Sequence, residues 1–360
     1  MIYIILGTRA QLIKMAPVIQ ILERNKFSFK LLHTGQHFDS LNEICQDFGI
    51  KSPWQSLYEG KEVSSIGQAL LWCSSMSFLL ISNKFKAFVA DEKANNLILV
   101  HGDTLSTLLG AALGKRSKIP VAHVESGLRS FNIGNPFPEE ITRLITFKLS
   151  NIAFCPSKWA ENNLINHSHL QTIHTEGNTI TDSLKFIYNK ETDYPTPAEP
   201  YGVISIHRFE NIFFKKQFVK ILDQIKTISK QYHLVFVLHP ATRKQLEKLN
   251  LFSILQESPN IEFRPRTGYK NFIQLLSSCT FVISDGGSNQ EELAILGKPT
   301  YLMRKSTERK DGLNKNIVLG EYSNEILSHF ISHLDEFTYS PQKITTNPSQ
   351  KIVSSLTQYL

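Results

Sequence analysis

The stretch LILVHGDT, residues 97–104, decides the fold class of this chain. Four apolar residues in a row, followed within a few positions by a glycine and an acid, are typical of a buried parallel strand that ends in a loop. The pattern returns in IPVAHVE, residues 119–125, where Glu125 closes the run. Open parallel sheets bind ligands at the carboxyl ends of their strands. Asp103 and Glu125 are therefore predicted to meet a substrate and to be available for acid–base chemistry.

Strands and helices alternate along the chain, which predicts an α/β protein with doubly wound parallel sheets. The expected strands cover residues 3–6, 29–33, 97–100, 120–124, 152–155, 203–206, 233–238, 261–263, 281–284 and 300–303. The clearest expected helices cover residues 11–24, 64–90, 104–115, 138–149, 157–166 and 348–360. A polar, proline-rich link, residues 189–200, separates two such series. We therefore expect two Rossmann-like domains that face each other across a cleft.

Composition favours a cytoplasmic protein without stable membrane insertion. Hydrophobic residues make up 41% of the chain and charged residues 20%, as in soluble globular proteins. The most apolar helix, residues 66–81, is interrupted by serines and is too short to span a bilayer. Residues 1–6 are interpreted as a first strand and not as a secretion signal. The four scattered cysteines form no CxxC pair, which indicates free thiols in a reducing compartment and no zinc site.

The net charge of +7 and the pI near 9.0 leave two interpretations open. An excess of cations favours anionic ligands or an acidic membrane surface. The lysine-rich segments 212–250 and 304–315 can equally produce a generally basic surface without a specific partner. No nucleic-acid-binding motif is present, so no nucleic acid is expected as a partner.

A strand–glycine–helix junction near the N-terminus is a candidate phosphate site. Gly7 ends the first expected strand, Arg9 follows it, and Lys14 lies in the first turns of the next helix. Helix N-termini offer free N–H groups and a positive dipole end to anions. A plain tight turn with solvated cations explains these residues equally well.

The segment DGGSNQEE, residues 285–292, is a second candidate phosphate site because it follows the expected strand 281–284. Gly286 and Gly287 allow close backbone approach, and Ser288 or the residue after it is expected to start the next helix. Glu292, one turn in, can accept hydrogen bonds from the two ribose hydroxyls of a nucleotide. A favourable interaction with the helix dipole is the alternative reason for an acid at this place.

Histidines and an acidic helix start complete the candidate residues. His207 and His239 each follow an expected strand, where they can contact a diphosphate or be satisfied locally. Glu139 opens an expected helix and shares a face with Arg143, four residues on, so the two side chains can pair. Acids in a first helical turn are also ordinary helix-start chemistry, and these residues alone do not assign a function.

Taken together, these motifs resemble the non-hydrolysing UDP-N-acetylglucosamine 2-epimerase family. The resemblance runs over nearly the whole chain and is carried by residues 7–9, 14–17, 34–37, 101–104, 124–129, 138–140, 176–179, 207–208, 290–292 and 307–309. It implies a glycosyltransferase-B-like fold with the active site in the interdomain cleft. It also implies an N-terminal domain of residues 1–170 plus 346–360 that carries the catalytic carboxylates, and a UDP-binding domain of residues 171–345. Family members are often dimers, which implies a homodimer.

The resemblance implies a reaction and a set of residues. UDP is eliminated across C1–C2 of the sugar and adds back after the C2 proton has been delivered to the other face, in the pathway to a surface polysaccharide. No metal, NAD or other cofactor is needed. The implied catalytic residues are Asp103, Glu125, Glu139 and His207. The implied substrate-binding residues are Arg9, Lys14, Gln36, His37, Arg143, His239, Gly286, Gly287, Ser288, Glu292 and Arg309.

The chain departs from the family pattern at several places. Gln11 stands where the family has Glu, and residues 285–289 and 309–312 also differ from the usual motifs. Asp39 and, by our alignment, Ala69 occupy positions that bind an allosteric substrate molecule in bacterial members, so we expect weak or absent substrate activation. These changes also allow a modified substrate, such as a diacetamido uronic acid nucleotide.

Three other functions remain open at this point. A hydrolysing relative would release free N-acetylmannosamine and UDP. A glycosyltransferase built on the same fold would use a nucleotide sugar, and the basic pI would then serve a membrane-bound acceptor. A non-catalytic nucleotide sensor fits least, because the charged set of the expected cleft is complete.

Overall fold

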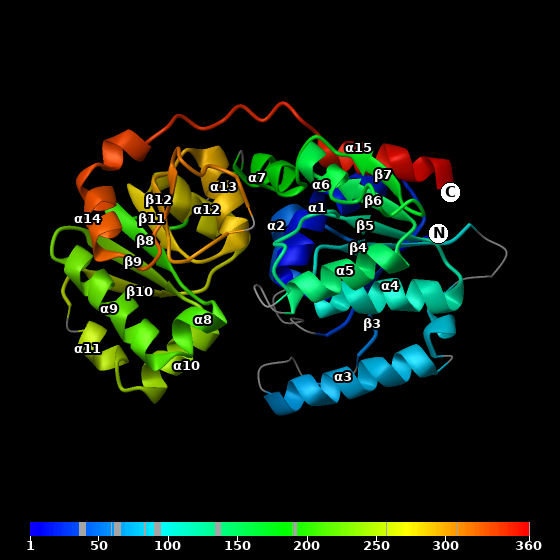
Figure 1. Ribbon diagram of the computed structural model, residues 1–360, viewed down its shortest axis with the longest axis horizontal. Helices are drawn as coiled ribbons and strands as arrows, with labels where there is room; N and C mark the ends of the chain where they lie inside the picture. The colour runs from blue at the N-terminus through cyan, green and yellow to red at the C-terminus, as the bar shows by residue number, and fades with distance from the viewer. Residues whose placement is uncertain are drawn as a thin grey trace. The chain divides into compact units, whose positions relative to one another are not determined.

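The computed structural model describes residues 1–35, 41–58, 60, 66–82, 84–89, 95–133, 138–188, 190, 193–256, 258–307 and 309–359. The chain folds as two compact units, which are shown in Figure 1. The first unit consists of Met1–Phe186 together with Thr345–Leu360, and the second of Ile187–Ile344. Each unit contains one parallel sheet.

The sheet of the first unit has seven strands in the order β3-β2-β1-β4-β5-β6-β7. Their bounds are β1 Ile2–Leu6, β2 Phe29–His33, β3 Trp54–Ser56, β4 Leu97–His101, β5 Val121–Val124, β6 Ile152–Cys155 and β7 Gln171–His174. The helices are α1 Arg9–Arg24, α2 Leu41–Phe48, α3 Ile66–Ile81, α4 Leu105–Ser117, α5 Glu139–Leu149, α6 Lys158–Asn162, α7 Ile180–Tyr188 and α15 Pro348–Leu356. Helices α3, α4 and α5 cover one face of the sheet, and α1 and α15 cover the other (Figure 1).

The sheet of the second unit has six strands in the order β10-β9-β8-β11-β12-β13. Their bounds are β8 Tyr201–Ser205, β9 His233–Leu238, β10 Ile261–Pro265, β11 Phe281–Ser284, β12 Thr300–Leu302 and β13 Ile317–Leu319. The helices are α8 Phe209–Ile212, α9 Lys215–Ser229, α10 Pro240–Lys248, α11 Phe252–Gln256, α12 Tyr269–Ser278, α13 Gly287–Leu296 and α14 Asn324–Ser332. The central strands of both sheets are almost wholly buried, which explains why their sequences are continuous apolar runs.

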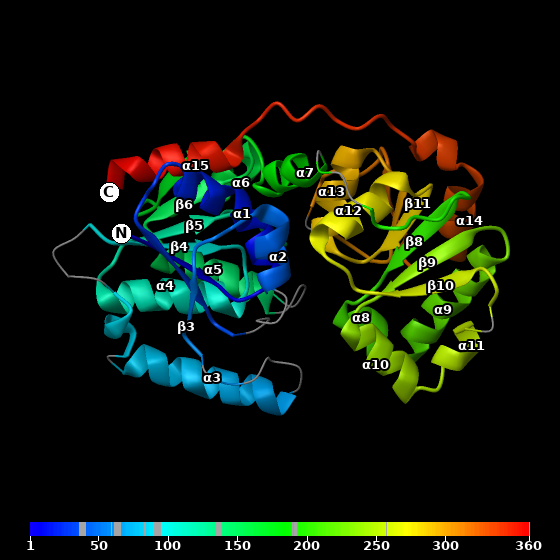
Figure 2. The ribbon, with the colours of Figure 1, turned by 180° about the vertical axis from the view of Figure 1, so that it is seen from behind.

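The C-terminal helix and all but the last two residues of α7 belong to the first unit. Helix α15 buries Ile352, Val353 and Leu356 and packs on α1 (Figure 2). The Ser183 hydroxyl of α7 donates a 2.6 Å hydrogen bond to the backbone oxygen of Ile13 in α1. Strand β7 pairs with β6, so β7 and α7 up to Phe186 lie in the first unit although they follow the expected boundary at residue 170.

Three expected helices are shorter than predicted. Helix α15 ends at Leu356 and a 3₁₀ turn, Thr357–Tyr359, follows it, where a helix to residue 360 was expected. Helix α3 ends at Ile81, and a short 3₁₀ turn, Lys84–Ala87, follows where a continuous helix to residue 90 was expected. Helix α6 ends at Asn162 and not at residue 166. Turns of three or four residues are frequent where a helix pattern weakens. No helix in the described ranges is long and apolar enough to cross a membrane.

Candidate active site

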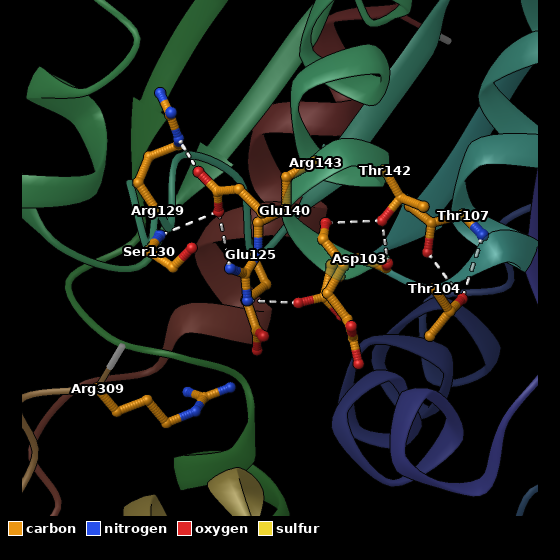
Figure 3. A network of polar contacts seen from close by, with 12 residues as sticks. Asp103, Thr104, Thr107, Glu125, Arg129, Ser130, Glu140, Thr142, Arg143 and Arg309 are labelled. Atoms are coloured by element: carbon orange, nitrogen blue, oxygen red, sulfur yellow. Dashed lines mark hydrogen bonds and ion pairs between the residues drawn. The ribbon is translucent and has the colours of Figure 1, made fainter. Parts of the chain in front are cut away.

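Two carboxylates stand at the ends of neighbouring strands in the first unit. Strands β4 and β5 pair in parallel, with His101 opposite Val124. Glu125 directly follows β5, and Asp103 comes two residues after β4. Both turns use left-handed backbone, at Glu125 (φ 62°) and at Gly102 (φ 71°). Such a conformation is uncommon for a glutamate, and it turns the chain sharply at the strand end (Figure 3).

Glu125 lies in a buried polar cluster. Its carboxylate accepts hydrogen bonds from the ammonium of Lys14 and the side-chain amide of Asn178, and His101 Nε2 lies 3.6 Å from it. The side chains of Lys14 and Glu125 are only 4% and 5% exposed. A buried carboxylate requires such compensation, since an uncompensated charge would be costly. The cluster holds Glu125 in one orientation and brings a cation from α1 beside it.

Helix α1 begins where the sequence predicts a phosphate site. Thr8 caps the helix and accepts from the Gln11 N–H, while the Gln11 side chain accepts from the N–H groups of Gly7 and Thr8. The Arg9 guanidinium lies 2.9 Å from Glu43 of α2. Lys14 points to Glu125, so it serves the carboxylate cluster in this structure.

Asp103 is held by Arg143. The guanidinium Nη2 lies 2.5 Å from the Asp103 carboxylate, and Nη1 lies 3.2 Å from Glu140 (Figure 3). The Arg143 side chain is 5% exposed and that of Asp103 is 25% exposed. Arg143 is thus buried between two carboxylates, and Asp103 remains accessible to a ligand.

Glu140 is the residue of this network that sequence reasoning missed. It is fully buried and accepts from Arg129 Nε at 2.5 Å and from the N–H of Ser130 at 3.0 Å, in addition to Arg143. Burial alone would raise the pKa of Glu140, but the hydrogen bonds from Ser130 and Arg129 and the charge of Arg129 lower it overall. The signal was present as the second acid of the Pro-Glu-Glu motif. Glu139 next to it is half-buried at the first position of α5.

In the second unit, Asp285 organises the end of β8. It is fully buried and accepts from the backbone N–H groups of His207 (3.0 and 3.1 Å) and Arg208 (2.9 Å) and from the side-chain amide of Asn211 (2.9 Å). The His207 ring stacks on His239 with centroids 5.0 Å apart, and its Nδ1 lies 3.3 Å from Asp285. The structure therefore brings both predicted histidines together, and His207 lies beside a carboxylate that sequence reasoning did not select.

Helix α13 starts with two glycines. Gly286 is the N-cap and Gly287 the first helical residue, so the expected start at Ser288 or Asn289 is wrong by one or two positions. A side chain at Gly286 would place its Cβ 3.3 Å from the His207 ring. The cap has no side-chain hydrogen bond, and N–H groups in the first turn of such a helix are suited to an anion.

Of the remaining predicted residues of the second unit, Glu292 and Arg309 are buried, and Ser288 is half-buried in the first turn of α13. Glu292 is 3% exposed and lies near Tyr269, whose pKa is raised well above its ordinary value by burial and by the charge of Glu292. Arg309 pairs with Glu291, and the Gln290 side chain holds the backbone oxygen of Arg309 at 3.2 Å. These contacts fix the loop after β12 on α13.

Some predicted residues cannot be placed. Gln36, His37 and Asp39 lie outside the described residues, and so does the side chain of Ala69. Within the described ranges, no group of three or more His, Cys, Asp or Glu side chains is arranged to hold a metal ion.

Comparison with known proteins decides the family. The family model described as UDP-N-acetylglucosamine 2-epimerase matches residues 20–356. The chain belongs to this family. It is 31% identical to the UDP-N-acetylglucosamine 2-epimerase of Methanocaldococcus jannaschii over 342 residues, which cover 90% of this chain and 89% of the relative.

A further relative and a solved structure are similar to this chain over most of its length. The UDP-2,3-diacetamido-2,3-dideoxy-D-glucuronate 2-epimerase of Pseudomonas aeruginosa is 33% identical over 315 residues, 84% of this chain and 83% of the relative. The crystal structure of the Methanocaldococcus jannaschii enzyme in complex with UDP-GlcNAc and UDP matches with a TM-score of 0.83 at 29% identity, and covers 99% of both chains. The predicted family and the glycosyltransferase-B-like class of two parallel α/β units are thereby confirmed, and the chain is an enzyme of this family.

Proposed function

We propose that this enzyme inverts C2 of a UDP-N-acetylhexosamine and interconverts UDP-GlcNAc and UDP-ManNAc. The observation that carries the proposal is the placement of Asp103 and Glu125 at neighbouring strand ends, each in contact with a cation. Inversion at carbon requires a proton to leave one face and another to arrive on the opposite face, so it needs more than one acid–base group. Glu139 at the start of α5 is the third carboxyl in the proposal.

The proposed reaction is an elimination followed by an addition. A carboxylate takes the C2 proton, its electron pair forms the C1–C2 double bond, and the C1–O bond breaks with its pair going to UDP. A UDP oxygen then adds back to C1 while C2 takes a proton on the other face. The C2 proton is weakly acidic, so stabilisation of the departing UDP must drive the first step.

The proposal assigns UDP to two sets of groups. His207, His239 and the helix start at Gly286 and Gly287 would bind the diphosphate, with Glu292 near the ribose. Arg9, Lys14 and Arg143 would supply positive charge as UDP leaves. The same proposal includes Ser288 and Arg309 as nucleotide contacts.

Proton NMR in deuterated water tests the reaction. Incubation with UDP-GlcNAc is expected to give UDP-ManNAc with deuterium at C2. Asp103→Asn and Glu125→Gln are expected to abolish turnover while UDP still binds, and Glu247→Gln, an exposed acid of α10, is the matched control with normal activity. Full activity in both site variants would refute the assigned roles.

A second substrate is favoured by one specific observation. The Pseudomonas aeruginosa relative, named for a diacetamido glucuronate nucleotide, is 33% identical over 84% of this chain, and the Methanocaldococcus jannaschii UDP-N-acetylglucosamine 2-epimerase is 31% identical over 90% of it. If UDP-GlcNAc shows no exchange at C2 and the diacetamido uronic acid nucleotide does, the substrate is the latter. Free N-acetylmannosamine would indicate the hydrolysing reaction, and UDP release that depends on an acceptor would indicate a transferase.

We also propose a homodimer formed through α3. No charged residue occurs in residues 66–81, yet Leu71, Phe78 and Ile81 are 66%, 57% and 76% exposed. Leu71 and Phe78 are equally far from the Ser74–Ser75 pair, so two antiparallel copies of α3 would match each other about a two-fold axis. Phe78→Glu is expected to give a monomer by light scattering, and an unchanged mass would refute this interface. Separately, we propose that the enzyme acts in the cytoplasm and in surface polysaccharide synthesis.

A further inference from the structure

Three consecutive backbone carbonyls at the end of β4 are held by side chains from three other elements. Gln11 of α1 donates to the His101 oxygen at 2.7 Å. His123 of β5 contacts the Gly102 oxygen at 2.7 Å. Thr142 of α5 donates to the Asp103 oxygen. Loop carbonyls usually bond to water, so a side-chain donor at each of three in a row fixes this turn far more tightly than an ordinary loop.

The His123 contact determines the protonation of the ring. A carbonyl oxygen only accepts, so Nε2 must carry the proton in this hydrogen bond. The imidazole is fully buried beside Phe147, with ring centroids 5.8 Å apart. Burial lowers the pKa of His123 to about 4, so the ring is neutral near pH 7.

The carbonyl oxygen that His123 contacts belongs to Gly102, and the turn after β4 depends on the backbone conformation of this glycine. Gly102 has φ 71°, and the next residue presents its carboxylate to Arg143. Rotation of the Gly102–Asp103 peptide would move that carboxylate, and the His123 N–H opposes this rotation directly. Displacements of about 1 Å at a reacting group are enough to cost a large factor in rate.

We propose that His123 is a positioning residue, which fixes the Gly102–Asp103 peptide and through it the Asp103 carboxylate. The inference rests on the proposed function, because Asp103 is the acid–base group that it positions. His123 does not exchange protons with the substrate. Its N–H holds the backbone, and its ring has no other role in the reaction.

A pair of variants separates positioning from simple core filling. His123→Gln keeps an N–H donor at a similar reach, whereas His123→Leu fills a similar volume and has none. We expect His123→Leu to lower kcat by about a hundredfold with KM and the Kd of UDP changed less than about threefold. His123→Gln should recover most of kcat. Equal kcat in the two variants, whether both are normal or both are reduced, overturns the proposal.

Amide hydrogen exchange supplies a measurement that does not depend on turnover. In His123→Leu, exchange in residues 101–104 should increase about tenfold or more over wild type, while His123→Gln stays near wild type. Unchanged exchange in His123→Leu also overturns the proposal. If wild-type enzyme converts none of the nucleotide sugars, the proposed function fails, and the exchange data still decide whether His123 holds the turn.

Discussion

Acid should destabilise the first unit through His123 more than through an ordinary histidine. The pKa of this buried ring is lowered from 6.5 to about 4, first of all by burial. Above pH 6.5 the ring is neutral in both the folded and the unfolded chain and has no effect. As the pH falls below 6.5, the unfolded chain takes up a proton that the folded chain refuses, so stability is lost down to about pH 4.

The magnitude follows from the pH interval. Between pH 6.5 and pH 5 the loss is about 1.5 units at roughly 1.4 kcal/mol per unit, or about 2 kcal/mol. At pH 4 it would approach about 3 kcal/mol. The folded chain also loses stability in acid when carboxylates with a lowered pKa, such as Glu140, take up protons. A wild-type measurement alone would therefore mix these effects.

The difference between wild type and His123→Gln isolates the ring. Urea unfolding followed by tryptophan fluorescence reports on the first unit, because all three tryptophans, Trp54, Trp72 and Trp159, belong to it. Between pH 7 and pH 5 the free energy of unfolding should fall by about 2 kcal/mol more in wild type than in the variant. A difference that does not depend on pH would mean that His123 is charged in the fold, and would refute the reasoning.

Three further outcomes are expected. Asp285→Asn should weaken UDP binding about tenfold by calorimetry, because the backbone that it holds at the end of β8 loses a charged acceptor. Glu140→Gln should destabilise the first unit by about 3 kcal/mol in urea, since Arg143 would lose a buried partner, and a loss below about 1 kcal/mol would contradict this. Gln11→Glu should cost about 1–3 kcal/mol in the same assay, because a carboxylate cannot donate to the His101 oxygen; unchanged stability would show that the bond is dispensable.

The central strands could be predicted from the sequence because burial on both faces demands continuous apolar runs. Strands β3, β7 and β13 were missed because they do not require a continuous apolar run. They have only three or four residues and stand at sheet edges, where one neighbour is absent and the apolar requirement is weaker. Their pairing depends on the strand beside them, which no local pattern reveals.

Some of the site residues could likewise be predicted from the sequence, and others could not. Asp103 and Glu125 could be predicted because each lies within two residues of the end of a recognisable strand. The partners that orient them could not, since Lys14 is 111 residues from Glu125 and Asn178 is 53 residues away. Such pairs form only when strands and helices assemble around the sheet, so they cannot be predicted from the spacing of residues in the sequence.

The return of α15 to the first unit has a consequence for biosynthesis. The ribosome delivers residues 187–344 before it delivers Pro348–Leu356, so the second unit is a continuous segment that can fold while the first still lacks its last helix. Until α15 arrives, the apolar surface of α1 that it covers stays exposed to solvent and to chaperones. The first unit to emerge from the ribosome is therefore the last to be completed.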